Sequence, residues 1–292
     1  MGLDFSGRVA IVTGAGGGLG RLHALGLAAR GAKVLVNDLD GAQAVVDEIT
    51  AAGGQALANG ASVADVAAVQ AMVDQALRTW GQVDILVNNA GILRDRSFSK
   101  MTLDDFRLVM DVHLMGAVHC CKAVWASMNE RKYGRIIMTT SSTGLYGNFG
   151  QSNYGAAKMA LVGLMQTLAI EGAKNNIRVN CLAPTAATRM TEGLLPPAVL
   201  EALKPEAVVP ALLWLASEDA PTRAIACAGA GTFAAANVTL THGLHLGLDG
   251  DTPERLAAAW ARITDRSGDS VPASGAAQGQ NEVAQAMAAQ RG

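Results

Sequence analysis

The glycine-rich segment Gly14–Gly20 constrains the fold more than any other stretch of this chain. An apolar run over residues 8–13 precedes it and predicts a buried parallel strand, and an apolar helical pattern follows it to residue 29. A strand, a glycine loop and a helix in that order place the amides of a helix N-terminus around a pyrophosphate. The loop therefore predicts a dinucleotide site. Its predicted cofactor contacts are Gly14, Gly18, Leu19 and Gly20.

The spacing within this loop is Gly14-x-x-x-Gly18-x-Gly20, which is wider than the common Gly-x-Gly-x-x-Gly form. The narrower form would need a glycine where Leu19 stands. A glycine loop alone is weak evidence for a nucleotide, because glycine-rich turns are common. Its position between a predicted strand and a predicted helix makes the loop stronger evidence for a dinucleotide site.

Asp38 ends a second predicted strand, over residues 33–38. A carboxylate at that point can hydrogen-bond the ribose hydroxyls of an adenosine and repel a 2′-phosphate. Gly17 supplies no positive charge where a 2′-phosphate would need one. Both features favour NAD over NADP. The alternative is a solvated acid at the end of a strand.

The rest of the chain to residue 232 alternates short apolar runs with helical patterns, which predicts an α/β fold with a parallel sheet. Asn88–Gly91 follows one such run, and its amides suit either a strand end against a ligand or a closing turn. We expect one Rossmann-type domain over residues 1–232 and a C-terminal extension over 233–292. In the extension we expect a hairpin around residues 239–244, a helix over residues 253–265 and, from Ser267, a mobile or partner-docked tail.

Tyr154 and Lys158 lie four residues apart at the start of a predicted helix, so both side chains share one helix face. A free tyrosine has a pKa of about 10, which is too high for proton transfer at neutral pH. The helix N-terminus and the lysine ammonium would both lower it. Ser141, at the end of the preceding predicted strand, could hold the same substrate oxygen. These three groups suit proton transfer at an alcohol or a carbonyl.

Composition argues against several classes of function. The net charge of −2 and the absence of a basic block give no reason to expect nucleic acid as a partner. The four cysteines fit neither a disulfide scaffold nor a zinc site, and His242 and His245 lack further ligands at metal-binding spacing. We therefore expect no metal and a reducing, cytoplasmic setting. We also expect no run apolar and long enough to span a membrane.

Taken together, Thr13-Gly14-x-x-x-Gly18-x-Gly20, Asn88-Asn89-Ala90-Gly91, and Ser141 with Tyr154 and Lys158 resemble the short-chain dehydrogenase/reductase family. The resemblance covers roughly residues 6–232. It implies a doubly wound, seven-stranded parallel sheet, NAD(P)-linked oxidoreduction, and a homodimer or homotetramer.

The resemblance also implies roles for residues. Tyr154 would be the acid–base, Lys158 would lower its pKa and contact the nicotinamide ribose, and Ser141 would hold the substrate oxygen. His113 stands where the family usually has an asparagine and would support Lys158 through water. The family's acidic adenine contact is replaced by Ala61, which could weaken adenine binding. The implied cofactor contacts outside the glycine loop are Asp38, Ser62, Val63, Asn89, Ala90, Gly91, Tyr154, Lys158, Pro184 and Thr188.

A narrower resemblance, carried by residues 91–98, 133–138, 146–151 and 203–206, is to the branch formed by the dehydrogenase part of peroxisomal multifunctional enzyme type 2. That branch oxidises (3R)-hydroxyacyl-CoA thioesters with NAD. We expect a lipid-type 3-hydroxyacyl substrate, with Tyr146, Phe149 and Gln151 near the mouth of its pocket. The alternatives are a steroid or other lipid alcohol dehydrogenase, a 3-oxoacyl reductase, and a dinucleotide-binding regulatory protein without catalysis.

Overall fold

An eight-stranded sheet forms the centre of the structure, which is a computed structural model and describes residues 2–187 and 196–290. Its strand order is β3-β2-β1-β4-β5-β6-β7-β8. The strands are β1 (Val9–Thr13), β2 (Lys33–Asn37), β3 (Gln55–Asn59), β4 (Ile85–Asn88), β5 (Gly134–Thr139), β6 (Ile177–Pro184), β7 (Ile225–Gly229) and β8 (Thr232–Ala236). The pairs from β3 to β7 are all parallel. This confirms the doubly wound Rossmann-type prediction.

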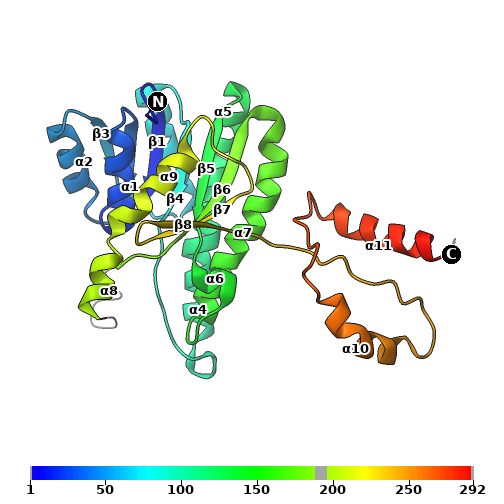
Figure 1. Cartoon of the computed structure of the whole chain (residues 1–292). Helices are drawn as coiled ribbons and strands as arrows, with labels where there is room; N and C mark the ends of the chain where they lie inside the picture. The colour runs from blue at the N-terminus through cyan, green and yellow to red at the C-terminus, as the bar shows by residue number, and fades with distance from the viewer. Residues whose placement is uncertain (1, 188–195, 291–292) are drawn as a thin grey trace. The chain divides into compact units, whose positions relative to one another are not determined.

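Helices cover both faces of this sheet (Figure 1). The helices of the sheet domain are α1 (Gly18–Ala28), α2 (Ala42–Ala51), α3 (Val66–Trp80), α4 (Leu103–Met110), α5 (Gly116–Arg131), α6 (Ser142–Tyr146), α7 (Ser152–Gly172), α8 (Pro197–Ala202) and α9 (Val209–Ala216). Helices α1, α2 and α9 share one face, where Val12, Val36 and Val87 contribute to the core. Helices α3, α5 and α7 cover the other. Because strand side chains alternate between faces, strands covered on both sides are apolar throughout.

Strand register brings distant residues to one edge of the sheet. Thr13 pairs with Asn37, and Asn88 lies beside Met138 at the end of β5. We call this the carboxyl edge, and the opposite one, where the strands begin, the amino edge. In open parallel sheets ligands bind outside the carboxyl edge, at the point where the strand order reverses. Here the order reverses between β1 and β4.

The helical run from Leu103 to Arg131 is continuous but not uniform. Thr102 caps the N-terminus of α4: its hydroxyl accepts a hydrogen bond from the Asp105 amide and donates one to the Asp105 carboxylate, each at 3.0 Å. Between α4 and α5 the turn η2 (Asp111–Met115) is π-helical and carries His113. Such turns occur frequently at functional sites. By length and composition this run could cross a membrane, contrary to our expectation; the core helices of soluble proteins pass the same test.

The eighth strand corrects the predicted count of seven. Ala230 and Gly231, both with positive φ (50° and 72°), form the two-residue connection from β7 to β8. Two central residues with positive φ are typical of a tight hairpin turn, so β8 returns along β7. The hairpin is therefore here and not around residues 239–244, where we expected one; there the described contact is a bridge between Leu240 and Ser270.

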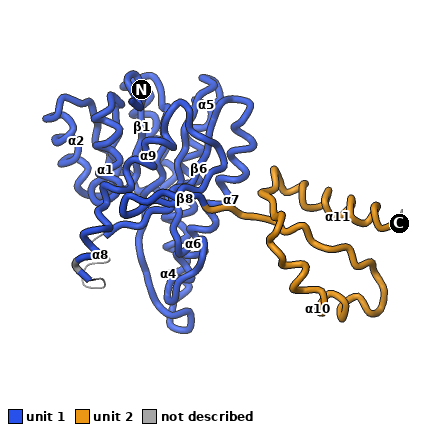
Figure 2. Tube along the Cα trace, in the orientation of Figure 1, with its two compact units in different colours: residues 1–235 blue, residues 236–292 orange. Residues whose placement is uncertain are grey.

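The chain divides into two compact units, residues 1–235 and 236–292 (Figure 2). The second unit contains α10 (Thr252–Ile263) and α11 (Ala276–Ala289). The helix α10 was expected. The helix α11 was not, because glycine, glutamine and alanine in its sequence led us to predict a mobile tail. Its side chains are largely exposed, so no buried stripe marked it in the sequence.

Candidate active site

A cleft of about 760 Å³ opens at the carboxyl edge and joins most of the predicted site residues. The predicted residues that line it are Gly14, Gly18, Leu19, Gly20, Asp38, Ser62, Val63, Asn89, Ala90, Gly91, His113, Ser141, Tyr154, Lys158 and Pro184. They come from eight separate stretches of sequence. One cleft thus holds both the predicted dinucleotide contacts and the predicted proton-transfer groups.

The glycine loop is shaped to let a ligand approach the backbone. Gly14 has a φ of 64°, and a Cβ there would lie 2.7 Å from the Cα of Ala90. Gly18 has a φ of 53° and faces open space at the start of α1. A side chain at either position would be strained or would obstruct the loop. The loop and the helix N-terminus behind it fit a pyrophosphate.

Asp38 is fixed at the end of β2 by the glycine loop itself. Its Oδ2 accepts a hydrogen bond from the Gly16 amide at 2.8 Å, and its side chain reaches the cleft. Arg21, a nearby base on α1, is paired with Glu48 at 2.6 Å. A carboxylate held in this way fits ribose hydroxyls better than a 2′-phosphate.

The adenine end of the cleft is held by an amide network that sequence reasoning missed. The Asn37 side chain donates to the carbonyl of Ala61 at 2.9 Å and to Oδ1 of Asn59 at 3.1 Å. Oδ1 of Asn59 also accepts from the Ala61 amide at 2.9 Å. These contacts position the segment that ends at Val63, whose carbonyl accepts from His119 at 2.9 Å. Two asparagines at the ends of neighbouring parallel strands were the available signal.

Ser141, Tyr154, Lys158 and His113 lie together. The Ser141 hydroxyl caps α6 by accepting from the Thr143 amide at 3.1 Å, and it hydrogen-bonds the Tyr154 phenol. Lys158 lies one turn after Tyr154 on α7, with Nζ 5.5 Å from the centroid of the phenol ring. The His113 ring meets the Tyr154 ring edge to face, with centroids 5.3 Å apart. Their proximity agrees with the prediction, and their individual catalytic roles stay predictions.

Lys158 is almost completely buried. Its Nζ donates to the carbonyl of Thr139, at the end of β5, at 2.5 Å. Burial lowers the pKa of Lys158 to about 7, and the nearby Cys181 opposes that shift weakly. The amine is therefore poised to titrate near neutral pH, a property that concentrates at functional sites. Thr139 was not among the predicted residues, because its contribution is a backbone carbonyl.

The prediction that Tyr154 has a lowered pKa is wrong for this structure. Burial raises the pKa of Tyr154; the hydrogen bond with Ser141 offsets part of that shift, and the negative charge of Asp95 adds to it. The physical reason is that Lys158 directs its amine to Thr139 and loses much of its own charge on burial. The phenol is therefore protonated at neutral pH.

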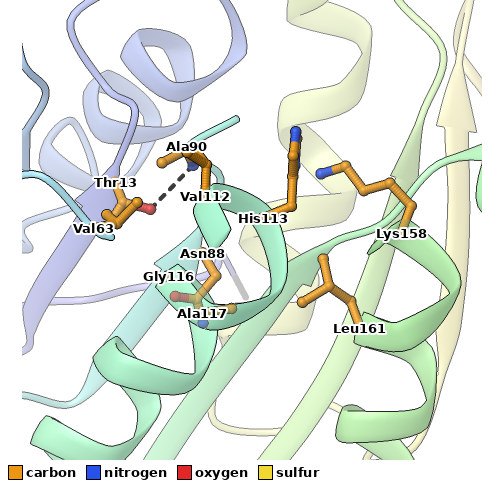
Figure 3. A pocket seen from close by; sticks show the side chains of 10 residues that line it. All are labelled: Thr13, Val63, Asn88, Ala90, Val112, His113, Gly116, Ala117, Lys158 and Leu161. Atoms are coloured by element: carbon orange, nitrogen blue, oxygen red, sulfur yellow. Dashed lines mark hydrogen bonds between the residues drawn. The ribbon is translucent and has the colours of Figure 1, made fainter. Parts of the chain in front are cut away.

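His113 connects the cleft to a small cavity of about 10 Å³ behind it, which is lined by Asn88, Lys158 and Leu161 among others (Figure 3). Its Nε2 lies 3.0 Å from the Ile92 amide and 2.8 Å from the Ile92 carbonyl. Burial, and then the charge of Lys158, lower the pKa of His113 to about 3, so the ring is neutral. Figure 3 shows the side chain of Lys158 extending toward this ring. The cavity is about large enough for one water molecule.

Three predicted residues that the structure describes, Tyr146, Phe149 and Gln151, do not line the cleft. Tyr146 and Phe149 are largely exposed. Gln151 precedes α7 and donates to Asp95 at 2.8 Å, so it joins the α6–α7 connection to the segment after β4. Thr188 lies outside the described residues. The predicted substrate roles of the first three stay predictions.

Comparison with known proteins supports the resemblance. The family model for short chain dehydrogenases matches residues 8–196. The chain is 48% identical to peroxisomal multifunctional enzyme A of Dictyostelium discoideum, over 94% of this chain and 64% of that protein. It spans between 31% and 64% of the length of the multifunctional enzymes of Dictyostelium discoideum, Saccharomyces cerevisiae and Mus musculus that it matches.

Two solved structures are similar over most of this chain. Full-length peroxisomal multifunctional enzyme type 2 from Drosophila melanogaster matches with a TM-score of 0.84 at 41% identity, covering 97% of this chain and 50% of that one. A 7α-hydroxysteroid dehydrogenase, solved with NADH and 7-oxo glycochenodeoxycholic acid, matches with a TM-score of 0.73 at 32% identity. That match covers 78% of this chain and 95% of the other.

Proposed function

Because this chain belongs to the short-chain dehydrogenase family, we propose that it is an NAD-dependent enzyme that interconverts a 3-hydroxyacyl-CoA thioester and its 3-oxo form. The observation that carries this proposal is the shared cleft: Ser141, Tyr154 and Lys158 line the same space as the glycine loop. A non-catalytic nucleotide-binding protein has no need of that set. The multifunctional enzymes at 47–48% identity support the acyl thioester.

The chain's own residues define the proton path. In the oxidation direction the Tyr154 phenolate takes the hydroxyl proton of the substrate, while Ser141 donates to the substrate oxygen. Lys158 and His113 lie on the inner side of the phenol, next to the small cavity, and can pass the proton inward. NAD, when bound, supplies the acceptor for the hydride. In the reduction direction the protonated phenol is the donor, which agrees with its raised pKa.

The preference for NAD rests on Asp38. Its carboxylate stands in the cleft with one oxygen held by Gly16, and Arg21 is paired with Glu48 and so contributes little positive charge. A 2′-phosphate would meet a negative charge there.

The test is a substrate panel followed by the absorbance of the reduced nicotinamide. It should include (3R)- and (3S)-hydroxyacyl-CoA thioesters, a hydroxysteroid and simple secondary alcohols, each with NAD and with NADP. We expect the highest kcat/KM with a 3-hydroxyacyl-CoA and NAD. Nucleotide binding without turnover of any alcohol would instead identify a regulatory protein, and a preference for the steroid would redirect the substrate assignment.

A further inference from the structure

The segment after β4 carries positive charge away from the cleft. Ile92 and Leu93 line the cleft, and the chain then continues through Arg94 and Arg96 to η1 (Phe98–Lys100), which ends in a third basic residue. Figure 1 shows this connection extending beyond the strand ends. We call the exposed side chains gathered here the basic–aromatic rim. Its members are Arg94, Arg96, Phe98, Lys100 and Phe149.

Hydrogen bonds hold the backbone of this segment against the start of α7. The Arg96 amide donates to the carbonyl of Gly150 at 2.9 Å, which brings Arg96 beside Phe149 in the neighbouring loop. Asn153, fully buried, donates to the carbonyl of Arg94 at 3.0 Å, and its Oδ1 accepts from the Tyr154 amide. The rim is therefore anchored to the turn of helix that presents the candidate acid–base.

The charges of the rim are mostly uncompensated. Arg94 lies 3.8 Å from Asp105, a loose pair, and it also donates to the carbonyl of Leu93. Arg96 donates only to the carbonyl of Asp95 among its described side-chain contacts. The Asp95 carboxylate is turned to Gln151 at 2.8 Å and does not pair with either arginine. Exposed guanidinium groups of this kind favour phosphate oxygens.

Two exposed aromatic side chains, Phe149 and Phe98, belong to the same rim as these charges. Phe149 is 90% exposed and Phe98 is 77% exposed, among the most exposed large apolar side chains of the sheet domain. Exposed apolar rings next to arginines fit a ligand that has both a flat base and phosphates, since a nucleobase stacks on an aromatic face. A simple alcohol or steroid has neither group.

We propose that the basic–aromatic rim binds the 3′-phosphoadenosine diphosphate end of coenzyme A. This inference rests on the proposed function, because it presumes that the substrate is a CoA thioester. The pantetheine arm separates the thioester from the phosphates, so the phosphates must bind away from Tyr154. Four members of the rim lie along the backbone that leaves the cleft at Leu93, and the hydrogen bond from Arg96 to Gly150 brings Phe149 next to them. The guanidinium groups would contact the phosphates, and the adenine would stack on Phe149.

The experiment compares one 3-hydroxyacyl group on coenzyme A and on N-acetylcysteamine, which keeps the thioester and lacks the phosphates. We expect the full-length wild type to favour the CoA thioester by at least about tenfold in kcat/KM, and to lose part of that advantage at high salt through screening. Arg96→Glu should reduce the advantage roughly tenfold, because it replaces attraction by repulsion. Phe149→Ala should reduce it about fivefold through lost stacking.

Arg107→Glu is the matched control, since Arg107 is an exposed base on α4 outside the rim and should leave the advantage unchanged. If Arg96→Glu does not fold, as judged by circular dichroism, Arg96→Gln should still reduce the advantage. Equal efficiency of the two thioesters in the wild type, or an unchanged advantage in both the Arg96 and the Phe149 variants, would overturn this inference alone. Turnover of neither thioester would overturn the proposed function and this inference with it.

Discussion

The two edges of the sheet treat buried polar groups in opposite ways. At the amino edge, Asp84 is fully buried and accepts hydrogen bonds from the Val9 amide at 2.8 Å and from Arg131 at 2.9 Å. Arg135 is equally buried there and donates to the carbonyl of Ser217 at 2.8 Å, among other carbonyls. Charges buried at this edge have partners, so they join the starts of the strands to their surroundings.

At the carboxyl edge, the polar atoms of Asn37 and Asn59 are paired, but several buried polar atoms around Lys158 lack partners. Nδ1 of His113, Oδ1 of Asn88 and Oγ1 of Thr139 have none among the described residues, and the Lys158 amine has one. Each unsatisfied buried group costs about 1–3 kcal/mol. The buried charges at the amino edge are therefore paired, whereas unsatisfied buried polar groups gather at the carboxyl edge around Lys158, where the chemistry is proposed.

The largest effect we expect is at the carboxyl edge. Tyr154→Phe removes the proton-transferring oxygen and keeps the ring that meets His113 edge to face. Turnover should fall by roughly 10²–10⁴-fold, the usual contribution of a general acid–base. NAD binding, measured by calorimetry, and the melting temperature should change little. Turnover close to that of the wild type would remove Tyr154 from its assigned role.

At the amino edge we expect a substitution to lower the stability of the fold and not the turnover. Asp84→Ala leaves Arg131 and the Val9 amide without their shared acceptor. Because the Arg131 side chain is 33% exposed, water can solvate its charge, and the expected cost is that of a buried amide left unsatisfied, about 1–3 kcal/mol. Chemical denaturation should show this loss, while kcat per folded molecule should stay the same. A large fall in kcat with unchanged stability would contradict the division of labour between the edges.

Replacing a buried basic residue with methionine should change the free energy of unfolding in opposite directions at the two edges. Lys158→Met should abolish activity and stabilise the protein by about 1–4 kcal/mol at neutral pH, because it removes a poorly paired buried amine. Arg135→Met should destabilise it, because several carbonyls lose their donor. Denaturation curves of both variants measure the contrast, and destabilisation by Lys158→Met would contradict it.

The stabilisation expected from Lys158→Met should depend on pH, and the direction follows from the lowered pKa of Lys158. Folding lowers the pKa of Lys158 from 10.5 to about 7, so between those values the unfolded chain binds a proton that the folded chain does not. The contribution of this residue therefore makes the wild type more stable as pH rises through that window. The advantage of Lys158→Met over the wild type should shrink over the same range.

Most residues that line the cleft at the carboxyl edge could be predicted from the sequence, because the patterns that mark them are local. The glycine loop follows β1 directly, Asp38 follows β2, and Tyr154 and Lys158 share one helix face. Each of these residues lines the same cleft. The parallel sheet followed from the alternation of apolar runs and helical patterns.

What sequence could not provide depends on contacts between distant elements. The raised pKa of Tyr154 comes from burial and from Asp95, which is 59 residues away in the sequence. The carbonyl of Thr139 holds Lys158, and backbone groups leave no trace in residue identity. The helix α11 was missed because it has no buried stripe, and the strand β8 because its residues are largely exposed.

A smaller effect at the carboxyl edge is expected in the preference for NAD over NADP. Asp38→Ala should narrow the preference for NAD over NADP by roughly tenfold to a hundredfold, since hydrogen bonds to a charged group contribute about 1.5–3 kcal/mol. The ratio of kcat/KM for the two cofactors measures it. Asp47→Ala, on the exposed side of α2, is the control and should leave the ratio unchanged. A wild type that already prefers NADP would refute the assignment of Asp38.

The smallest effect that we expect is a shift in the pH profile of kcat/KM for alcohol oxidation. It should follow neutralisation of an acid near the carboxyl edge and not of one at the amino edge. Asp95 raises the pKa of Tyr154 through its charge, so Asp95→Asn should lower that pKa. Alcohol oxidation needs the phenolate, so the rise of kcat/KM with pH should move to lower pH. An asparagine can still accept from Gln151, which keeps the segment after β4 in place. The same neutralisation at the amino edge, Asp84→Asn, should leave the profile where it is, because Asp84 does not act on Tyr154. If both variants moved the profile equally, the shift would report the net charge of the protein, and the electrostatic separation of the edges would be lost.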